Sequence, residues 1–356
     1  MSRFEPRTLG RVERQALAAA FVLTIALLAT ACGGNDEGSS SSKQPPQAQL
    51  IAKVKPSVIQ VYGMSSDEMY GGTGVIIDTK GKLAITNAHV TSGLSGTKAR
   101  SGGFETSVQV VATAPCDDVA LIRLASLPPR ATPLEFGTAA TVKAGQKVTA
   151  LGYPNSFVNP ATQKLNSTVG NVSVDGTVAA EPSDALPHYT SVVQHQAPIG
   201  HGSSGGPLVD ANGLLLGINA LANDPGETAN QAYAISSERI QELLPTLRKG
   251  KSIAYVGWDL YPARFLEQED LEILGWTLDP ADEGMVVLDV DTGSNADRRD
   301  FVFGDYIERI ESNVVNTMSD VCDVLHSKRG QVIEVQGRYM TAEDANVTWS
   351  EKVRVR

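Results

Sequence analysis

One short segment rich in glycine and serine could carry nucleophilic chemistry. Residues 202–207 read Gly-Ser-Ser-Gly-Gly-Pro. A serine attacks an acyl carbon only when its hydroxyl is accessible and nearby backbone N–H groups can hold the oxyanion that forms. Glycines on both sides let the chain bend tightly and turn those amides toward one point. We therefore expect Ser204 to be a nucleophile, with the N–H groups of Gly202 and Ser204 as its oxyanion hole.

Glycine and serine runs are more often linkers, and this chain contains one at residues 38–42, bordered by polar residues and prolines. The run at 202–207 is different, because Ile199 precedes it and the apolar stretch 207–209 follows it. Apolar flanks indicate that the chain is buried on both sides of the bend. This context favours a site over a linker.

A base and an acid that could serve this serine lie earlier in the chain. His89 follows the apolar run 83–86, which would place its imidazole at the end of a strand, with a pKa suited to taking and returning a proton. Asp118 begins the apolar run 118–124 and would fix the tautomer of His89 and stabilise the imidazolium. Asp117 is an alternative acid, and either aspartate could instead cap a turn or face solvent. The order His, Asp, Ser is one of the orders that serine hydrolases use.

The elements around these residues are mostly short strands. Apolar β-type runs punctuated by glycine and proline predict an all-β domain of barrels or sandwiches. A helix is expected over residues 236–249, and beyond it the pattern mixes strands (285–290 and 331–336) with a helix near 319–327. The runs that predict strands in the first part are residues 57–62, 74–77, 83–86, 108–111, 119–122, 147–151 and 214–218.

Three motifs together resemble the signature blocks of chymotrypsin-fold proteases, specifically the HtrA (DegP-like) family. They are Thr-Asn-Ala-His-Val at 86–90, Asp-Val-Ala-Leu at 118–121 and Gly-Ser-Ser-Gly-Gly-Pro-Leu-Val at 202–209. Further blocks at 72–78, 150–154, 167–172 and 193–199 extend the resemblance over most of residues 50–247. The chain departs from the family pattern at Ser203, His201 and Gln196, which leaves the state of the oxyanion loop open.

The resemblance implies a fold class: an all-β, double β-barrel (chymotrypsin-like) protease domain at residues 50–249, followed by a small α+β PDZ-like domain at 250–356. Each barrel would have six strands, with the catalytic residues in the cleft between them. The resemblance also implies that the primary specificity pocket is walled by four apolar residues, Pro198, Ile199, Ile218 and Ala220. A cationic side chain buried there would lack a partner, so we expect cleavage after small or medium aliphatic residues of unfolded chains.

Residues 255–258, 284–290 and 303–310 resemble a PDZ domain of the HtrA type. In that fold, backbone amides near Val256 and Gly257 would bind the terminal carboxylate of a peptide that adds as a strand. Trp258 is bulkier than the usual residue, and charged residues at 297–300 replace small apolar ones. The alternative is a degenerate module that packs on the protease without binding C-terminal peptides.

The first 31 residues have the pattern of an export signal, with four arginines before an apolar run at 16–31 that is too short to span a bilayer. Residues 28–32, ending in Cys32, resemble the lipobox of bacterial lipoproteins, which implies cleavage before Cys32 and acylation of its sulfur. Residues 32–49 would form a flexible tether. We therefore expect an exported protein at the cell envelope, with lipid anchoring to the outer face of the membrane. Plain secretion and an uncleaved anchor are the alternatives.

Composition excludes several other classes. The net charge is −10 and no basic patch is dense enough to suggest nucleic-acid binding. The five histidines and three cysteines show no metal-ligand spacing, so we expect no metal and no cofactor. Cys116 and Cys322 lie in separate predicted domains, and we expect buried free thiols rather than a disulfide. The family resemblance suggests a homotrimer, although residues 50–57 offer no aromatic anchor.

Two functions follow from this sequence. The first is an endopeptidase of protein quality control that acts on unfolded proteins, with the PDZ-like module binding substrates or regulating activity. The second is a weakly active or inactive peptide-binding sensor or scaffold at the envelope. The presence of all three triad residues and Gly202 favours the first.

Overall fold

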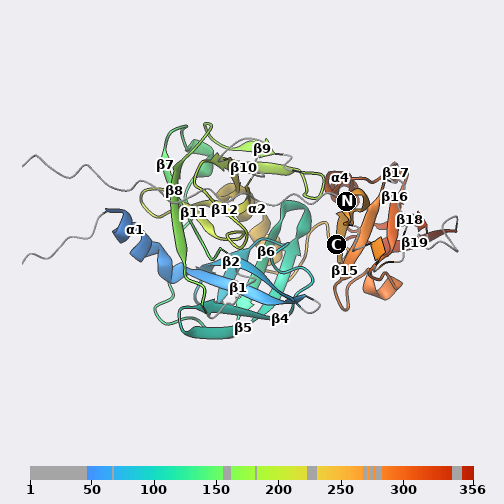
Figure 1. Ribbon diagram of the computed structural model, residues 1–356, viewed down its shortest axis with the longest axis horizontal. Helices are drawn as coiled ribbons and strands as arrows, with labels where there is room; N and C mark the ends of the chain where they lie inside the picture. Colours follow the sequence, from blue (N-terminus) through green and yellow to red (C-terminus); the bar gives the residue numbers. More distant parts are fainter. Residues whose placement is uncertain are drawn as a thin grey trace, which may run out of the picture. The chain divides into compact units, whose positions relative to one another are not determined.

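The computed structural model describes residues 46–65, 68–154, 162–180, 183–222, 231–267, 271–272, 274, 276, 283–338 and 347–356 (Figure 1). The predicted export signal, Cys32 and most of the predicted tether lie outside the described residues. Within the described part of the chain, no helix is both long and apolar enough to cross a membrane.

The first half of the protease region is a closed barrel of six antiparallel strands in the order β1-β2-β3-β6-β5-β4. Its interior is filled by aliphatic side chains such as Ile59, Ile76 and Ile122, none of which is accessible to solvent. This barrel agrees with the expected one. Its strands are β1 (Val58–Ser65), β2 (Glu68–Asp78), β3 (Leu83–Thr86), β4 (Ser95–Ser101), β5 (Phe104–Ala114) and β6 (Val119–Leu124).

The second half is a sheet of seven strands rather than the expected six-stranded barrel, in the order β8-β7-β11-β12-β13-β10-β9. The additional member is the short β9, which pairs with β10 at one edge of the sheet. A single bridge between Val172 and His195 links the end of β8 to β10. The strands are β7 (Lys147–Gly152), β8 (Asn166–Asn171), β9 (Val178–Ala180), β10 (Tyr189–His195), β11 (Pro207–Val209), β12 (Leu215–Ala222) and β13 (Ala232–Ser236).

Two α-helices accompany these strands. The helix α2 (Ser237–Leu247) confirms the predicted one, since the Ser236 hydroxyl accepts from the Arg239 amide at 3.1 Å and caps it. The helix α1 (Pro46–Val54) was not predicted, and it begins inside the segment expected to be a tether. Its Lys53 ammonium donates to the Asn212 carbonyl and its Gln47 amide donates to Thr149, so the protease domain holds it in place. Short 3₁₀ turns are η1 (Lys55–Ser57), η2 (Pro115–Asp117) and η3 (Ala139–Thr141).

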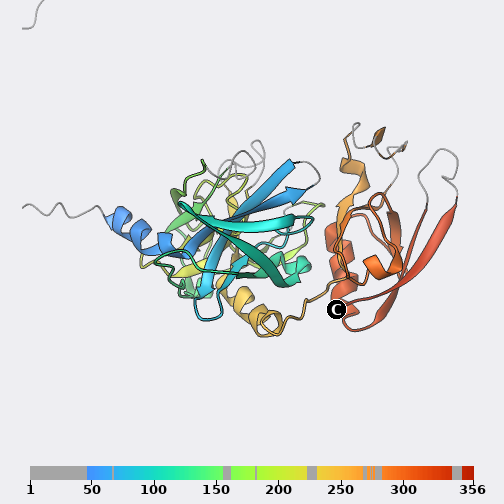
Figure 2. The same cartoon turned by 90° about the horizontal axis from the view of Figure 1, so that it is seen from below.

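The C-terminal module is a separate antiparallel sheet in the order β14-β15-β16-β18-β19, with β17 paired to β16 and the helix α4 beside it (orange to red in Figure 2). A capping box at Thr317 and Asp320 begins α4. The module agrees with the expected small α+β domain. Its elements are β14 (Trp258–Pro262), η4 (Ala263–Phe265), β15 (Met285–Val290), η5 (Asp297–Arg299), β16 (Tyr306–Ile310), β17 (Asn313–Val314), α4 (Met318–Ser327), β18 (Val332–Arg338) and β19 (Thr348–Arg354).

The expectation of free thiols is wrong, because Cys116 and Cys322 form a disulfide with a Cα–Cα separation of 5.4 Å. Cys116 lies in η2 of the protease domain and Cys322 in α4 of the C-terminal module. The prediction assumed that cysteines of separate domains would not meet, but the two domains are packed against each other at this point. The bond covalently fastens α4 beside the residues that precede Asp118.

Other contacts reinforce the same junction, which lies within one compact unit. The Met318 amide at the start of α4 donates to the Asp184 carbonyl at 2.8 Å, and Arg264 forms an ion pair with the Asp184 carboxylate. In the connecting segment, the Ile253 amide donates to the Thr113 carbonyl at 2.9 Å. The C-terminal module is therefore held by its linker, by ionic contacts and by a disulfide.

The disulfide predicts a measurable stability difference. It closes a loop spanning 206 residues, so the Cys116→Ala/Cys322→Ala variant should lose about 2–4 kcal/mol of unfolding free energy, because the unfolded chain regains freedom. Thermal unfolding and limited proteolysis near residues 248–257 would measure this loss. Each single variant should lose a similar amount, since either one breaks the bond. If peptide mapping of the unreduced protein found both cysteines alkylated, the disulfide assignment would be wrong.

Candidate active site

His89 lies in the turn that follows β3 and leads to β4 of the same barrel. Thr86, the last residue of β3, donates its hydroxyl to the Thr73 carbonyl at 2.7 Å, and the next residue, Asn87, donates its side-chain amide to the Asp118 carbonyl at 2.9 Å. The turn closes as the Thr91 and Ser92 amides donate to the Ala88 carbonyl. These bonds fix the backbone on both sides of His89, while 41% of its side chain stays accessible.

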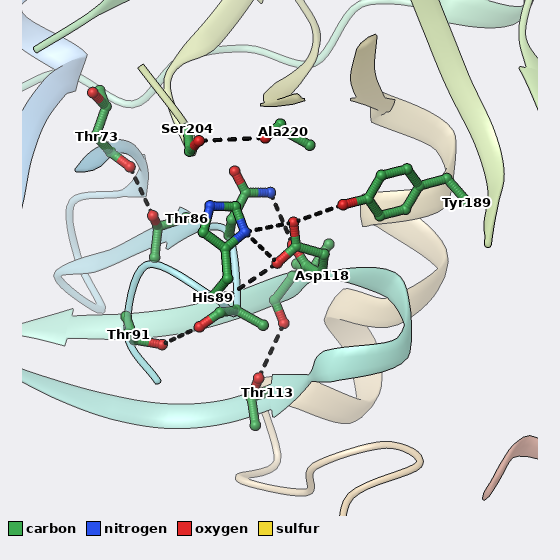
Figure 3. A network of polar contacts seen from close by, with 12 residues as sticks. Thr73, Thr86, His89, Thr91, Thr113, Asp118, Tyr189, Ser204 and Ala220 are labelled. Atoms are coloured by element: carbon green, nitrogen blue, oxygen red, sulfur yellow. Dashed lines mark hydrogen bonds and ion pairs between the residues drawn. The ribbon is translucent and has the colours of Figure 1, made fainter. Parts of the chain in front are cut away.

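Asp118 is buried directly behind His89 (Figure 3). It follows η2 with a left-handed backbone (φ 51°), which turns its carboxylate toward the histidine. The carboxylate accepts from His89 Nδ1 at 2.9 and 3.0 Å, from the His89 backbone amide at 3.0 Å and from the Tyr189 hydroxyl at 3.1 Å. A buried carboxylate needs such donors to stay ionised. The contacts hold His89 with Nδ1 protonated and leave Nε2 free to act as a base.

The electrostatics of this pair suit proton transfer. The largest single influence on the pKa of His89 is its partial removal from water, which lowers the pKa. The charge and hydrogen bond of Asp118, together with a smaller contribution from the charge of Asp259, act in the opposite direction. Their sum is larger, so the pKa of His89 is raised above its usual value. Burial, together with the charge and hydrogen bond of Asp118, raises the pKa of Tyr189 well above its usual value. Tyr189 therefore stays protonated and remains a donor to Asp118.

Asp117 does not share this role. It is buried on the opposite side, where it forms an ion pair with Arg239 of α2 at 2.7 Å and lies 3.9 Å from His326 of α4. Of the two candidate acids, only Asp118 contacts His89.

Ser204 lies in the loop that joins β10 to β11 of the second sheet, and the shape of this loop depends on glycine. Gly202 and Gly205 have positive φ values of 88° and 80°, and a Cβ on Gly205 would lie 2.0 Å from the Thr73 carbonyl oxygen. Within the described residues, the amides of Gly202 and Ser204 have no hydrogen-bond partner, whereas the Ser203 amide donates to the Gly200 carbonyl at 2.9 Å. Two unpartnered amides beside a serine are what an oxyanion hole requires.

Thr73 of β2 holds this loop to the first barrel. Its hydroxyl donates to the Gly202 carbonyl at 2.7 Å and accepts from the Tyr153 amide at 2.9 Å, and its own amide donates to the Ser204 carbonyl at 2.8 Å. The side chain is entirely buried. One threonine thus connects the barrel that carries His89 to the loop that carries Ser204.

His89 and Ser204 line one cavity of about 810 Å³, together with Gly202. The Ser204 hydroxyl donates to the Ala220 carbonyl at 3.3 Å, and no hydrogen bond joins it to His89 (Figure 3). Such bonds are often long without substrate and form in the complex. A rotation of the serine side chain would be needed to bring its proton to Nε2.

The four residues predicted to wall the specificity pocket lie in different surroundings. Pro198 and Ile199 line a second cavity of about 190 Å³ next to Ser203. Ala220 contacts the Ser204 hydroxyl through its carbonyl. Ile218 has no solvent-accessible surface, packs in the main core and lines neither of these two cavities.

Val256 and Gly257 lie in the loop before β14, the edge strand of the C-terminal sheet. Their amides have no partner within the described residues, while the Gly257 carbonyl accepts from the Asp291 amide at 2.9 Å. Gly257 has a φ of 103°, and a Cβ there would lie 2.1 Å from Ser294. The neighbouring Tyr255 pairs with the last residue, Arg356.

Sequence reasoning missed Thr73 and Tyr189. Thr73 lies in a block that resembles the family, but nothing in its spacing showed a contact 129 residues away. Tyr189 comes from the second sheet, and only the fold brings it to Asp118. In the described part of the chain, no group of three or more histidine, cysteine or acidic residues is arranged to hold a metal.

Comparison with known proteins places these features in a class. A family profile described as "Trypsin-like peptidase domain" matches residues 72–218, which include all three residues of the site. The chain is 28% identical to human "Serine protease HTRA4" over 82% of this chain and 62% of that protein, and 27% identical to "Serine protease Do-like HtrA" of Bacillus subtilis over 77% and 63%. It thus spans somewhat less than two thirds of these relatives. The solved structure "HtrA-type protease AlgW with tripeptide" is 26% identical, with a TM-score of 0.52, over 88% of this chain and 98% of that one.

The fold and the site define a trypsin-like serine protease domain. Within that class, the chain is similar to serine proteases of the HtrA family.

The raised pKa of His89 predicts a pH dependence. The base must be neutral to accept a proton, so kcat/KM for peptide cleavage should rise with pH through a midpoint above the ordinary value of about 6.5. Asp118→Asn should lower this midpoint, since the raising charge is gone, and should reduce kcat by about 10⁴-fold, as in other enzymes with this triad. A pH–rate profile of both proteins measures the two effects. An unchanged midpoint in Asp118→Asn would contradict the assignment.

Thr73→Val tests the loop anchor. Valine has the same shape but cannot donate to the Gly202 carbonyl, so kcat should fall about 10- to 100-fold as the loop shifts. Thr106→Val is a matched control, because Thr106 is also buried and its hydroxyl also accepts from a backbone amide, that of Ser126 at 3.1 Å, away from the site. Steady-state kinetics and thermal unfolding of both variants separate the effects. Equal losses of kcat in the two variants would show that Thr73 acts only through stability.

Proposed function

We propose that this protein is a serine endopeptidase that hydrolyses peptide bonds of unfolded or misfolded proteins at the cell envelope. The observation that carries the proposal is a single cavity that presents Ser204 beside His89, with Asp118 hydrogen-bonded behind His89 and two unpartnered amides next to Ser204. These are the groups that acyl transfer requires, gathered around one cavity.

The reaction proceeds by acylation and deacylation. Ser204 Oγ attacks the scissile carbonyl carbon while His89 Nε2 takes the hydroxyl proton, and the Gly202 and Ser204 amides donate to the oxyanion. The C–N bond then breaks as His89 gives its proton to the leaving amine. Water repeats the sequence on the acyl-enzyme, with His89 again as base, and releases the acid and Ser204. Asp118 stabilises the imidazolium in each step but keeps its own charge.

The substrate preference follows from the apolar surroundings of the loop before Ser204. Among the described residues that line the cavity with Pro198 and Ile199, none is acidic. A buried lysine or arginine side chain would have no counter-charge there, whereas a small or medium aliphatic side chain would gain from burial. Cleavage after aliphatic residues, which are exposed in unfolded chains, is the expected outcome.

The C-terminal module would bind the end of a peptide. In the part of the module that the structure describes, β14 is paired on one side only and the amides of Val256 and Gly257 at its start have no partner, which is the arrangement that strand addition uses. A cavity of about 400 Å³ runs along β14 and Met318 and reaches His89 of the protease domain. A peptide bound there would lie next to the catalytic residues, so the module would present substrates or regulate activity.

The proposals for the location and the oligomeric state of the protein are based on its sequence. Export, acylation at Cys32 and anchoring to the outer face of the membrane account for the leader and the lipobox-like segment. The Cys116–Cys322 disulfide supports export, because such bonds persist in oxidising compartments and are rare in the cytosol. A homotrimer is proposed on the family resemblance alone.

The proposal is tested with the full chain purified in detergent. It should digest unfolded casein, and mass spectrometry should place the cuts after aliphatic residues. Ser204→Ala should lose activity by about 10⁶-fold. The neighbouring Ser203→Ala, which removes a hydroxyl from the same loop, should keep most of it. If the wild-type protein is as inert as Ser204→Ala while peptides ending in a free carboxylate still bind, the chain is a peptide-binding sensor or scaffold instead.

A further inference from the structure

One wall of the catalytic cavity comes from the C-terminal module. Asp259 of β14 lines the 810 Å³ cavity together with His89, Ser204 and Gly202 of the protease domain. The disulfide and the contacts of α4 and its linker hold the module in this position. Asp259 is therefore a fixed part of the surface that a substrate would meet.

Two cavities border the loop that carries the nucleophile. The smaller one is lined by Pro198 and Ile199, whereas Gly202 and Ser204 line the larger one. His89, which must protonate the leaving nitrogen, lines only the larger cavity of the two. The residues that follow the scissile bond should therefore enter the larger cavity, toward Asp259.

Asp259 lies close to other acidic side chains. Asp289 of β15 is its direct cross-strand partner, a like-charge pairing that destabilises a sheet. Within the described residues, no basic side chain forms an ion pair with either aspartate, and only His89 and His201 among the cavity-lining residues can carry positive charge. The pKa of Asp259 is raised, mainly by burial and further by the charges of Asp289 and Asp291. A hydrogen bond from Ser92 and the charge of His89 lower it, but by less. A cation in the cavity would relieve this repulsion.

We propose that Asp259 is a specificity-determining residue that binds a lysine or arginine side chain of the substrate on the leaving-group side of the scissile bond. The inference rests on the proposed peptidase function and extends it. It assigns to the C-terminal module a direct role in substrate choice, separate from any binding of peptide ends. The enzyme would then favour sites where an aliphatic residue precedes the cut and a basic residue follows it.

The test uses quenched fluorescent peptides with one aliphatic residue before the cut. Lysine, glutamine or glutamate is placed at the first, second or third position after it, and kcat/KM is measured with the full chain. At one of these positions, the wild-type protein should prefer lysine to glutamine by about tenfold, as expected for a charge contact in a partly buried site. Asp259→Asn should reduce this ratio to about one, and Asp259→Lys should reverse it in favour of glutamate.

Asp300→Asn is the matched control, since it removes an exposed aspartate of the same module that does not line the cavity. It should keep the wild-type lysine-to-glutamine ratio. A ratio retained in Asp259→Asn would overturn the role of Asp259 while leaving the peptidase function intact. Equal rates for the lysine, glutamine and glutamate peptides at every one of the positions in the wild-type protein would do the same. Failure of the wild-type protein to cleave any peptide, glutamine peptides included, would instead refute the peptidase function and the inference with it.

Discussion

The hydrogen bonds between Asp118 and His89 are the constraint on which the rest of the site depends. A carboxylate with 3% of its side chain exposed is costly unless donors surround it, and here the donors come from three places: the His89 ring, the His89 backbone and Tyr189 of the second sheet. Meeting this requirement fixes the end of β3, the left-handed turn at Asp118 and the docking of β10. The geometry that keeps the charge buried is also the geometry that prepares His89 as a base.

Residues 116–118 each form a bond or ion pair with a different part of the molecule. Cys116 is bonded to α4 of the C-terminal module, Asp117 is paired with α2, and Asp118 is paired with His89. Three consecutive residues thus connect the module, the terminal helix of the protease domain and the catalytic base. The backbone next to Asp118 is therefore held from both the C-terminal module and α2.

Much of this arrangement is predictable from the sequence, because the pattern of apolar residues is local. The strands β3 and β15 coincide with the predicted runs 83–86 and 285–290, and the capped, amphipathic helix α2 was expected from Ser236 and the spacing of its leucines. The order of His89, Asp118 and Ser204 likewise pointed to their chemistry. The sequence predicted that Asp118 would orient His89, and the structure shows the hydrogen bond between them.

What the sequence could not provide are the contacts that tertiary packing makes. The helix α1 forms from residues 46–54, which begin with proline and have no N-terminal cap in their pattern, and it is held by contacts with residues more than 100 positions away. The disulfide joins residues 206 positions apart, and Asp259 reaches the catalytic cavity only because the module packs there. Tyr189 and Thr73 act through partners on the other sheet, which no local spacing indicates.

The most direct test is a crystal structure of the protein after reaction with a fluorophosphonate, which captures the geometry of the tetrahedral intermediate. The account predicts a covalent bond from phosphorus to Ser204 Oγ, with a phosphoryl oxygen accepting from the Gly202 and Ser204 amides and His89 still bonded to Asp118. An unmodified Ser204, or an adduct whose oxygen points away from both amides, would contradict it.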